Sequence, residues 1–247
     1  MWSYFANPER FDRLARALIP WCWGVAAALF AVGLPWALYF SPGDYQQSDT
    51  VRIMYVHVPA AWLAMFAYAG LGGASFVYFI WRHNLADLAA RAIAPAGAVF
   101  AFICLATGSL WGRPMWGAWW VWDARLTSML VLFLLYLGYM ALRGAIEDEK
   151  LSARAGAILA MAGLINLPVI KFSVDWWNTL HQGASVFRFD GPTIDASQLW
   201  PLAIMALGFT VLYLALVLTQ MRAMMMERRA EALERRRERR LELEAEL

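Results

Sequence analysis

Five tryptophans fall within twelve consecutive positions near the middle of this 247-residue sequence. Indoles favour the headgroup level of a bilayer, but such an aromatic belt accounts for one or two of them. The same segment, residues 111–128, also contains glycines, a proline and flanking charges, so we interpret it as a flat apolar surface with polar edges. Its members of interest are Trp111, Trp116, Trp119, Trp120, Trp122, Asp123 and Arg125.

Such a surface suits a large, flat, apolar ligand with anionic groups at one edge. Indole faces supply contact area, and the guanidinium fork of arginine binds carboxylates through two hydrogen bonds. A porphyrin meets this description fully, whereas a quinone ring or a lipid headgroup meets part of it. The indoles alone therefore do not name the ligand, because haem also requires a group such as imidazole to bind its iron.

Composition shows which elements must position these residues. The chain is 61% hydrophobic and 16% charged with a mean hydropathy of +0.48, far more apolar than a soluble domain. Runs of about 20 apolar residues predict membrane-spanning helices. Six runs fit, at about residues 19–40, 58–81, 92–111, 126–142, 153–170 and 199–220. The expected fold is an all-α integral membrane protein with six transmembrane helices.

The distribution of Lys and Arg predicts the orientation of these helices, since cytoplasmic segments retain positive charge. With the N-terminus inside, 16 of the 21 Lys and Arg residues fall in inner segments. Both termini are then cytoplasmic, and the loops 41–57, 111–125 and 171–198 face outward. This arrangement places His57 and His181 on the face of the indole segment and His83 on the other. We therefore expect His57 and His181 to form an axial pair for haem iron.

Three smaller features carry narrower expectations. Arg52 is the sole cation of its loop and could pair with a haem propionate, with Asp44 or with Asp49; the sequence leaves this choice open. Asn166 and Pro168 in the fifth span predict an interhelical hydrogen bond and a kink rather than a ligand site. Residues 221–247 alternate Glu and Arg at helical spacing, so they predict a charged cytoplasmic helix that extends the last span of a 1–220 membrane domain.

Residues 111–128 resemble the WWD signature of haem-handling membrane proteins. The surrounding segments 44–47, 57–61 and 176–183 are similar to the haem exporter protein C (CcmC) family, and the resemblance runs from about residue 41 to residue 183. The six-helix layout agrees over the rest. The charged tail after Met221 is not a feature that we associate with this family.

The resemblance implies a component of the bacterial cytochrome c maturation system at the inner membrane. It implies that His57 and His181 bind haem b, carried as a transported ligand, and that residues 111–123 contact haem and its chaperone CcmE at the periplasmic face. It also implies CcmA, CcmB and CcmD as partners. Such a protein handles haem without catalytic groups, and we expect contact with membrane lipid and none with nucleic acid.

Three other classes of protein remain as alternatives. A b-type haem oxidoreductase would place paired histidines deep inside its spans, and no span here has a central histidine. A membrane subunit of a cytochrome c synthase tends to be larger, with additional membrane histidines. A transporter for another flat ligand would use the indoles but would not need His57 or His181.

Overall fold

The computed structural model describes residues 7–183, 185–186 and 191–245, which form helices and their connections with one isolated antiparallel bridge between Asp44 and Ser48. Six helical segments in this part of the chain are long and apolar enough to cross a membrane, so the predicted number of spans is confirmed. The helices are α2 (Pro8–Pro35), η1 (Trp36–Phe40), η2 (Asp49–Ile53), α3 (Met54–Trp81), α4 (Asn84–Trp116), α5 (Ala124–Ala145), α6 (Glu149–Gly163), α7 (Asn166–Trp176) and α8 (Ala196–Ala245).

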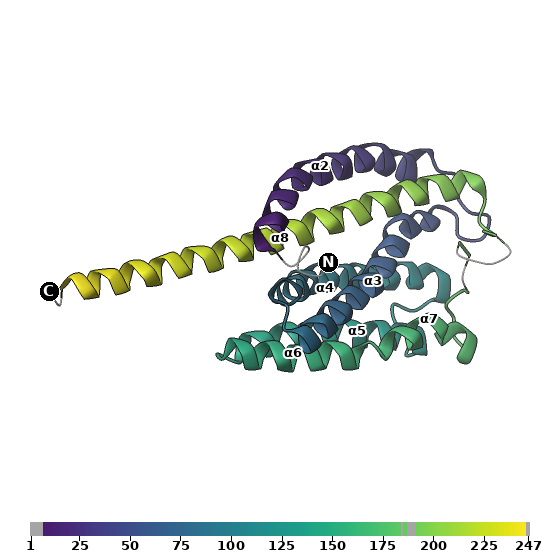
Figure 1. Ribbon diagram of the computed structural model, residues 1–247. Coiled ribbons are helices and arrows are strands. Elements are labelled where there is room, and N and C mark those ends of the chain that lie inside the picture. The colour runs from purple at the N-terminus through teal and green to yellow at the C-terminus, as the bar shows by residue number, and fades with distance from the viewer. Residues whose placement is uncertain (1–6, 184, 187–190, 246–247) are drawn as a thin grey trace.

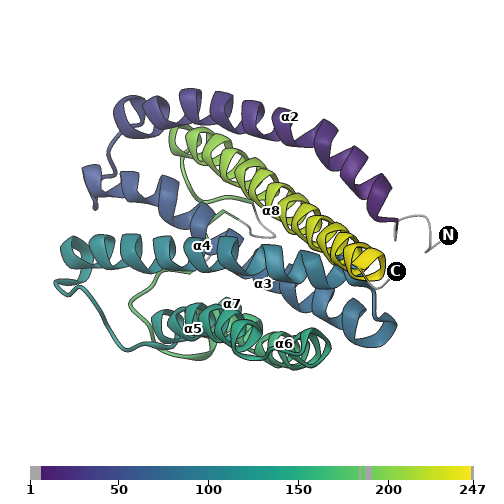
Figure 2. The same cartoon turned by 90° about the vertical axis from the view of Figure 1, so that its left-hand side faces the viewer.

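The helices lie in three layers, which are clearest in Figure 2. Helix α2 packs on α8, helices α3 and α4 pack on each other in the middle, and α5 lies with α6 and α7 on the far side. The connections between α2 and α3, between α4 and α5 and between α7 and α8 gather at one end of the bundle (Figure 1). Residues far apart in the sequence therefore meet at that end.

The fifth span is two helices rather than one kinked helix. Helix α6 ends at Gly163 and α7 begins at Asn166. Pro168 has no N–H to donate to the carbonyl of Leu164, and Leu167 N–H binds that oxygen instead at 3.1 Å. The Asn166 amide donates to the Ser128 carbonyl of α5 at 2.8 Å, which confirms the predicted interhelical hydrogen bond.

Helix α4 continues to Trp116, so the expectation that the indole segment is a loop from residue 111 was wrong for residues 111–116. The helix ends where Gly117 adopts a left-handed conformation with φ of 75°, which glycine tolerates because it has no Cβ. The Gly117 N–H binds the Arg113 carbonyl at 3.1 Å, and the Arg113 guanidinium donates back to the Gly117 carbonyl. Two indoles of the segment are therefore held on a rigid helix.

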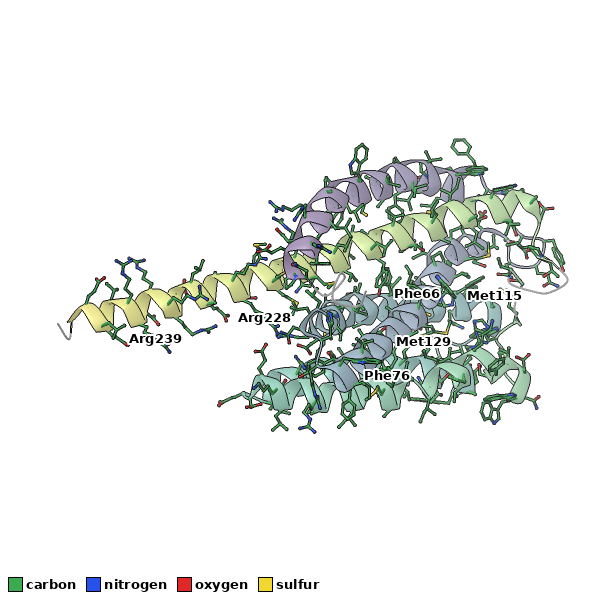
Figure 3. All side chains as sticks on the ribbon, in the orientation of Figure 1. Phe66, Phe76, Met115, Met129, Arg228 and Arg239 are labelled. Atoms are coloured by element: carbon green, nitrogen blue, oxygen red, sulfur yellow. The ribbon has the colours of Figure 1, made fainter. Side chains whose placement is uncertain are left out.

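Ion pairs gather at the opposite end of the bundle. Arg143 of α5 pairs with Asp87 of α4 at 3.0 Å, and both side chains are buried. Arg222 of α8 pairs with Asp12 of α2, also at 3.0 Å. Beyond these contacts α8 runs on without interruption to Ala245, so the predicted helical extension is confirmed up to that residue, and residues 246–247 lie outside the described part of the chain. Figure 3 shows Arg228 near the bundle and Arg239 on the free part. The orientation of this end toward the cytoplasm stays a prediction.

Candidate functional site

The structure brings His57 and His181 together, although 124 positions separate them in the sequence. Their ring centroids lie 6.4 Å apart, and the ring planes are inclined by 34°. His57 lies in the first turn of α3 and is 9% exposed, whereas His181 lies in the connection between α7 and α8. His83 precedes α4 at its N-cap position, at the other end of that helix from Trp111. The structure therefore places His57 and His181 together and His83 apart from them.

Thr107 of α4 determines that Nδ1 of the His57 ring carries a proton. The Thr107 hydroxyl donates to the carbonyl of Ile103 at 2.6 Å, and its oxygen lies 3.0 Å from Nδ1 of His57. A threonine hydroxyl has one proton, so its oxygen must accept a hydrogen bond from Nδ1–H of His57. In the neutral form of the His57 ring the proton is then on Nδ1, and Nε2 has the available lone pair.

His181 reaches the same tautomer through a different partner. Its Nδ1 lies 2.9 Å from the backbone carbonyl of Gln182, which can only accept a hydrogen bond, so Nδ1 carries the proton. Burial lowers the pKa of His181 below its ordinary value of 6.5, and Arg125 acts in the same direction; the Gln182 carbonyl and Asp123 oppose them. His181 is therefore neutral near pH 7 and also presents a bare Nε2.

Two imidazoles that each donate from Nδ1 are prepared to bind one metal through Nε2. With metal–nitrogen bonds of about 2.1 Å and a ring centre roughly 1 Å behind each nitrogen, imidazoles on opposite sides of one iron have centres roughly 6 Å apart. The observed 6.4 Å matches that separation. The donor set and its spacing thus fit a haem iron.

The two helical indoles each lie beside one of these imidazoles. The Trp111 ring meets the His57 ring nearly edge-on, at 5.6 Å and 80°. Its Nε1–H donates to the side-chain carbonyl of Gln47 at 2.9 Å, which ties the connection between η1 and η2 to α4. The Trp116 ring lies 6.4 Å from His181. Trp111 and Trp116 therefore each place an apolar ring against one member of the histidine pair.

The other three indoles lie in the connection between α4 and α5. Trp119 is 56% exposed and Trp122 is 75% exposed. Trp120 packs edge-on against Trp122 at 5.4 Å, and its own Nε1–H is buried with no hydrogen-bond partner among the described residues. The segment therefore has a part that faces the imidazoles and a part that is open at the surface.

The charged residues expected at the site have partners within the protein. Arg52 pairs with Asp49 at 3.2 Å, which is one of the alternatives left open by the sequence. Arg125 donates to the Ser173 hydroxyl at 2.7 Å and so joins α5 to α7. Asp123 caps α5 by accepting the Leu126 N–H at 2.8 Å, and its other oxygen accepts the hydroxyl of Thr179. Contact of these three residues with a ligand stays a prediction.

Sequence reasoning missed the polar residues that hold the rings of the site in place, namely Thr107 at His57, Thr179 at His181 and Gln47 at Trp111. Thr107 stands one helical turn before Trp111, and residues four apart share a helix face. That spacing was the signal that could have identified it. Gln47 and Thr179 lie in connections, where no helical or strand periodicity relates a residue to its neighbours in space.

Gly108 gives the His57 ring its space. A Cβ at this position would lie 3.0 Å from Cε1 and 3.5 Å from Nδ1 of His57. We expect Gly108→Ala to displace the ring, weaken its bond to Thr107 and raise the haem Kd by about tenfold, as loss of a ligand-orienting contact does. Haem titration of the detergent-purified variant measures this effect. Gly73→Ala is the matched control, because its Cβ would meet nothing within 4 Å; equal Kd values for the two variants would contradict the packing role of Gly108.

Six spans and a histidine pair surrounded by indoles define the class: a multi-pass membrane protein with a candidate haem site at one end of its bundle. The family model of heme exporter protein C matches residues 1–236. The chain belongs to the haem exporter protein C (CcmC) family.

Curated relatives agree with this match over nearly their whole lengths. Heme exporter protein C of Bradyrhizobium diazoefficiens is 54% identical over 229 residues, which cover 93% of this chain and 87% of the relative. The Escherichia coli K12 protein of the same name is 46% identical over 234 residues, with 93% and 94% covered. The Rhodobacter capsulatus protein is 41% identical over 238 residues, with 96% and 98% covered. The family match reaches residue 236 and so includes part of the charged tail, which we did not associate with the family from the sequence.

Proposed function

We propose that this protein binds haem b as a transported ligand through His57 and His181 and delivers it to the haem chaperone CcmE during c-type cytochrome biogenesis. The observation that carries the proposal is the meeting of two imidazoles beside Trp111 and Trp116, each with its Nδ1 hydrogen-bonded to another residue of the protein. The curated relatives are named heme exporter proteins, which supports haem as the ligand.

Each part of the site has a distinct task in this proposal. The histidines hold the iron, and the helical indoles cover apolar parts of the macrocycle by dispersion and burial. The exposed Trp119 and Trp122 supply an edge that the chaperone can contact. Arg52 is available to a propionate, because its present partner Asp49 is 76% exposed and a solvent-exposed ion pair contributes little.

The cellular setting belongs to the same proposal. The site faces the periplasm at the bacterial inner membrane, in agreement with the distribution of Lys and Arg in the loops. The protein acts as a haem-handling subunit of an export complex with CcmA, CcmB and CcmD rather than as an enzyme. Binding and release of the ligand require no acid, base or nucleophile from this chain.

The position of the histidines favours a protein that exchanges its haem. It disfavours a b-type haem oxidoreductase, which retains its haem. His57 stands four residues into α3, and His181 lies outside the six candidate spans. A cofactor held permanently for electron transfer would instead be enclosed by histidines near the middle of the spans. Access from the end of the bundle suits transfer to a second protein.

A transfer assay tests the proposed function. Haem-loaded, detergent-purified protein is mixed with the haem-free periplasmic domain of CcmE, the two are separated, and the haem on each is quantified by absorption. We expect haem to move to CcmE from the unmodified protein. Retention of all haem by the loaded protein, under conditions where CcmE accepts free haem, would contradict delivery.

A further inference from the structure

We infer that Thr179 is a positioning residue for His181, and that Asp123 acts on the haem site through Thr179; this inference rests on the proposed function, in which His181 binds haem iron. The Thr179 hydroxyl donates to Oδ2 of Asp123, and its oxygen accepts the backbone N–H of His181 at 3.1 Å. A hydroxyl has one proton and two lone pairs, so both bonds form at once.

The two bonds from Asp123 to Thr179 and from Thr179 to His181 are called the relay below. The remaining bonds of Asp123 anchor this relay to the bundle. Its Oδ1 accepts the N–H of Leu126 and caps α5, and the Thr127 N–H binds its backbone carbonyl at 3.0 Å. Both carboxylate oxygens are therefore engaged within the protein. Asp123 joins the start of a spanning helix to the connection that carries His181.

His181 depends on these hydrogen bonds because it lies between helices rather than within one. Helix α7 ends at Trp176 and α8 begins at Ala196. Among hydrogen bonds recorded between described residues, His181 itself binds Thr179 and Gln182 of its own connection. The Thr179–Asp123 bond is what joins those neighbours to α5.

His57 is held in an entirely different way. It lies within the regular backbone of α3, and its ring is fixed by Thr107 of α4. Residues 117–123 connect to His181 through Asp123 and Thr179, whereas their bond to α4 runs from the Ser109 hydroxyl to the Trp119 carbonyl at 2.7 Å and does not involve His57 itself. The relay couples the open part of the indole segment to one of the two imidazoles.

Spectroscopy of the full-length, ferric haem-loaded protein in detergent tests the role of Thr179. Thr179→Val removes the hydroxyl at nearly constant volume, whereas Thr179→Ser retains it. We expect the Val variant to convert from low-spin to high-spin haem and to raise the haem Kd by about tenfold. We expect the Ser variant to match the unmodified protein and added imidazole to restore the low-spin spectrum of the Val variant. An unchanged spectrum and Kd in Thr179→Val would overturn the inference.

Thr210→Val is the matched control for loss of a hydroxyl. The Thr210 hydroxyl donates to the Ala206 carbonyl one turn back in α8 at 2.7 Å. This variant carries the same chemical change within a spanning helix, and we expect it to keep the haem spectrum unchanged. A high-spin conversion in Thr210→Val as large as that in Thr179→Val would show general loosening of the fold and would also overturn the inference.

A double-mutant cycle tests whether Asp123 acts through Thr179. Asparagine retains an oxygen that caps α5, but its amide nitrogen cannot accept the Thr179 proton. We expect Asp123→Asn to raise the haem Kd in the unmodified background and to add little in Thr179→Val, because coupled residues are not additive. Full additivity would overturn the relay and assign Asp123 a separate contact.

His181→Gly separates failure of this inference from failure of the proposed function. If His181→Gly keeps the low-spin spectrum, the proposed ligand is wrong, and the positioning role of Thr179 fails with it. If His181→Gly becomes high-spin while Thr179→Val does not, the ligand stands and the positioning role alone fails.

Discussion

His57→Gly is expected to lose most of its haem during purification, with the apparent haem Kd raised by about 100-fold or more. Loss of a residue that merely orients a metal ligand already costs about 10- to 100-fold in affinity, and this variant removes the ligand itself. No other imidazole can take its place, because the remaining histidines are His181, which is the second proposed ligand, and His83, which lies at the other end of α4. The ratio of haem to protein and a haem titration in detergent measure the effect.

His83→Gly is the control for this variant, since it removes an imidazole from the N-cap position of α4 and leaves the candidate site intact. We expect its haem content to equal that of the unmodified protein. Added imidazole should return haem to His57→Gly, because the small ligand can enter the space left by the side chain. Equal haem affinity in His57→Gly and the unmodified protein would refute the ligand assignment.

Arg143→Met is expected to produce the largest loss of stability, with the free energy of unfolding lowered by about 3 to 5 kcal/mol. The Arg143 and Asp87 side chains are 6% and 8% exposed, and removing the guanidinium leaves a buried carboxylate. Arg228 lies 3.6 Å from the same carboxylate and offsets part of the loss. Denaturant unfolding in detergent micelles, followed by tryptophan fluorescence, measures the change.

Arg235→Met is the matched control for the buried pair. Arg235 pairs with Glu231 at 3.6 Å, but its side chain is 68% exposed on the free part of α8. An exposed pair of this kind contributes less than about 1 kcal/mol, so the control should unfold like the unmodified protein. Replacing Asp87 with Leu together with Arg143→Met should recover part of the stability, because no unpaired charge then remains. A loss no greater than that in Arg235→Met would show that Asp87 finds adequate partners elsewhere.

The membrane fold could be predicted because its signal is local. A span is a run of apolar residues of fixed length, and each run is read without knowing what packs against it. The same topology placed His57, His181 and the indole segment on one face, and the structure brings the two rings to 6.4 Å. The Asn166 hydrogen bond was predictable too, since an amide within a membrane span must find a partner.

The exact partners could not be predicted because they depend on pairings across many residues. Thr107 meets His57 across 50 positions, and Thr179 meets Asp123 across 56. No periodicity within a single segment records such contacts. The end of α4 was also misplaced, because Gly112, Arg113 and Pro114 resemble a turn, while the left-handed Gly117 is the residue that ends the helix.

The charged residues illustrate a further limit of reasoning from residue type. Arg125 and Asp123 have the chemistry to bind a propionate or a partner, yet in the structure they join α5 to α7 and to the His181 connection. Residue type indicates what a side chain can bind. Only its neighbours in space show what it does bind within the protein.

The most direct test of the account is the electron paramagnetic resonance spectrum of the ferric, haem-loaded protein in detergent. Two imidazoles bound through Nε2 of His57 and His181 predict a low-spin signal. They also predict that His181→Gly converts this signal to high-spin and that added imidazole reverses the conversion. A high-spin signal in the unmodified protein, or a low-spin signal that survives removal of both histidines, would contradict the account.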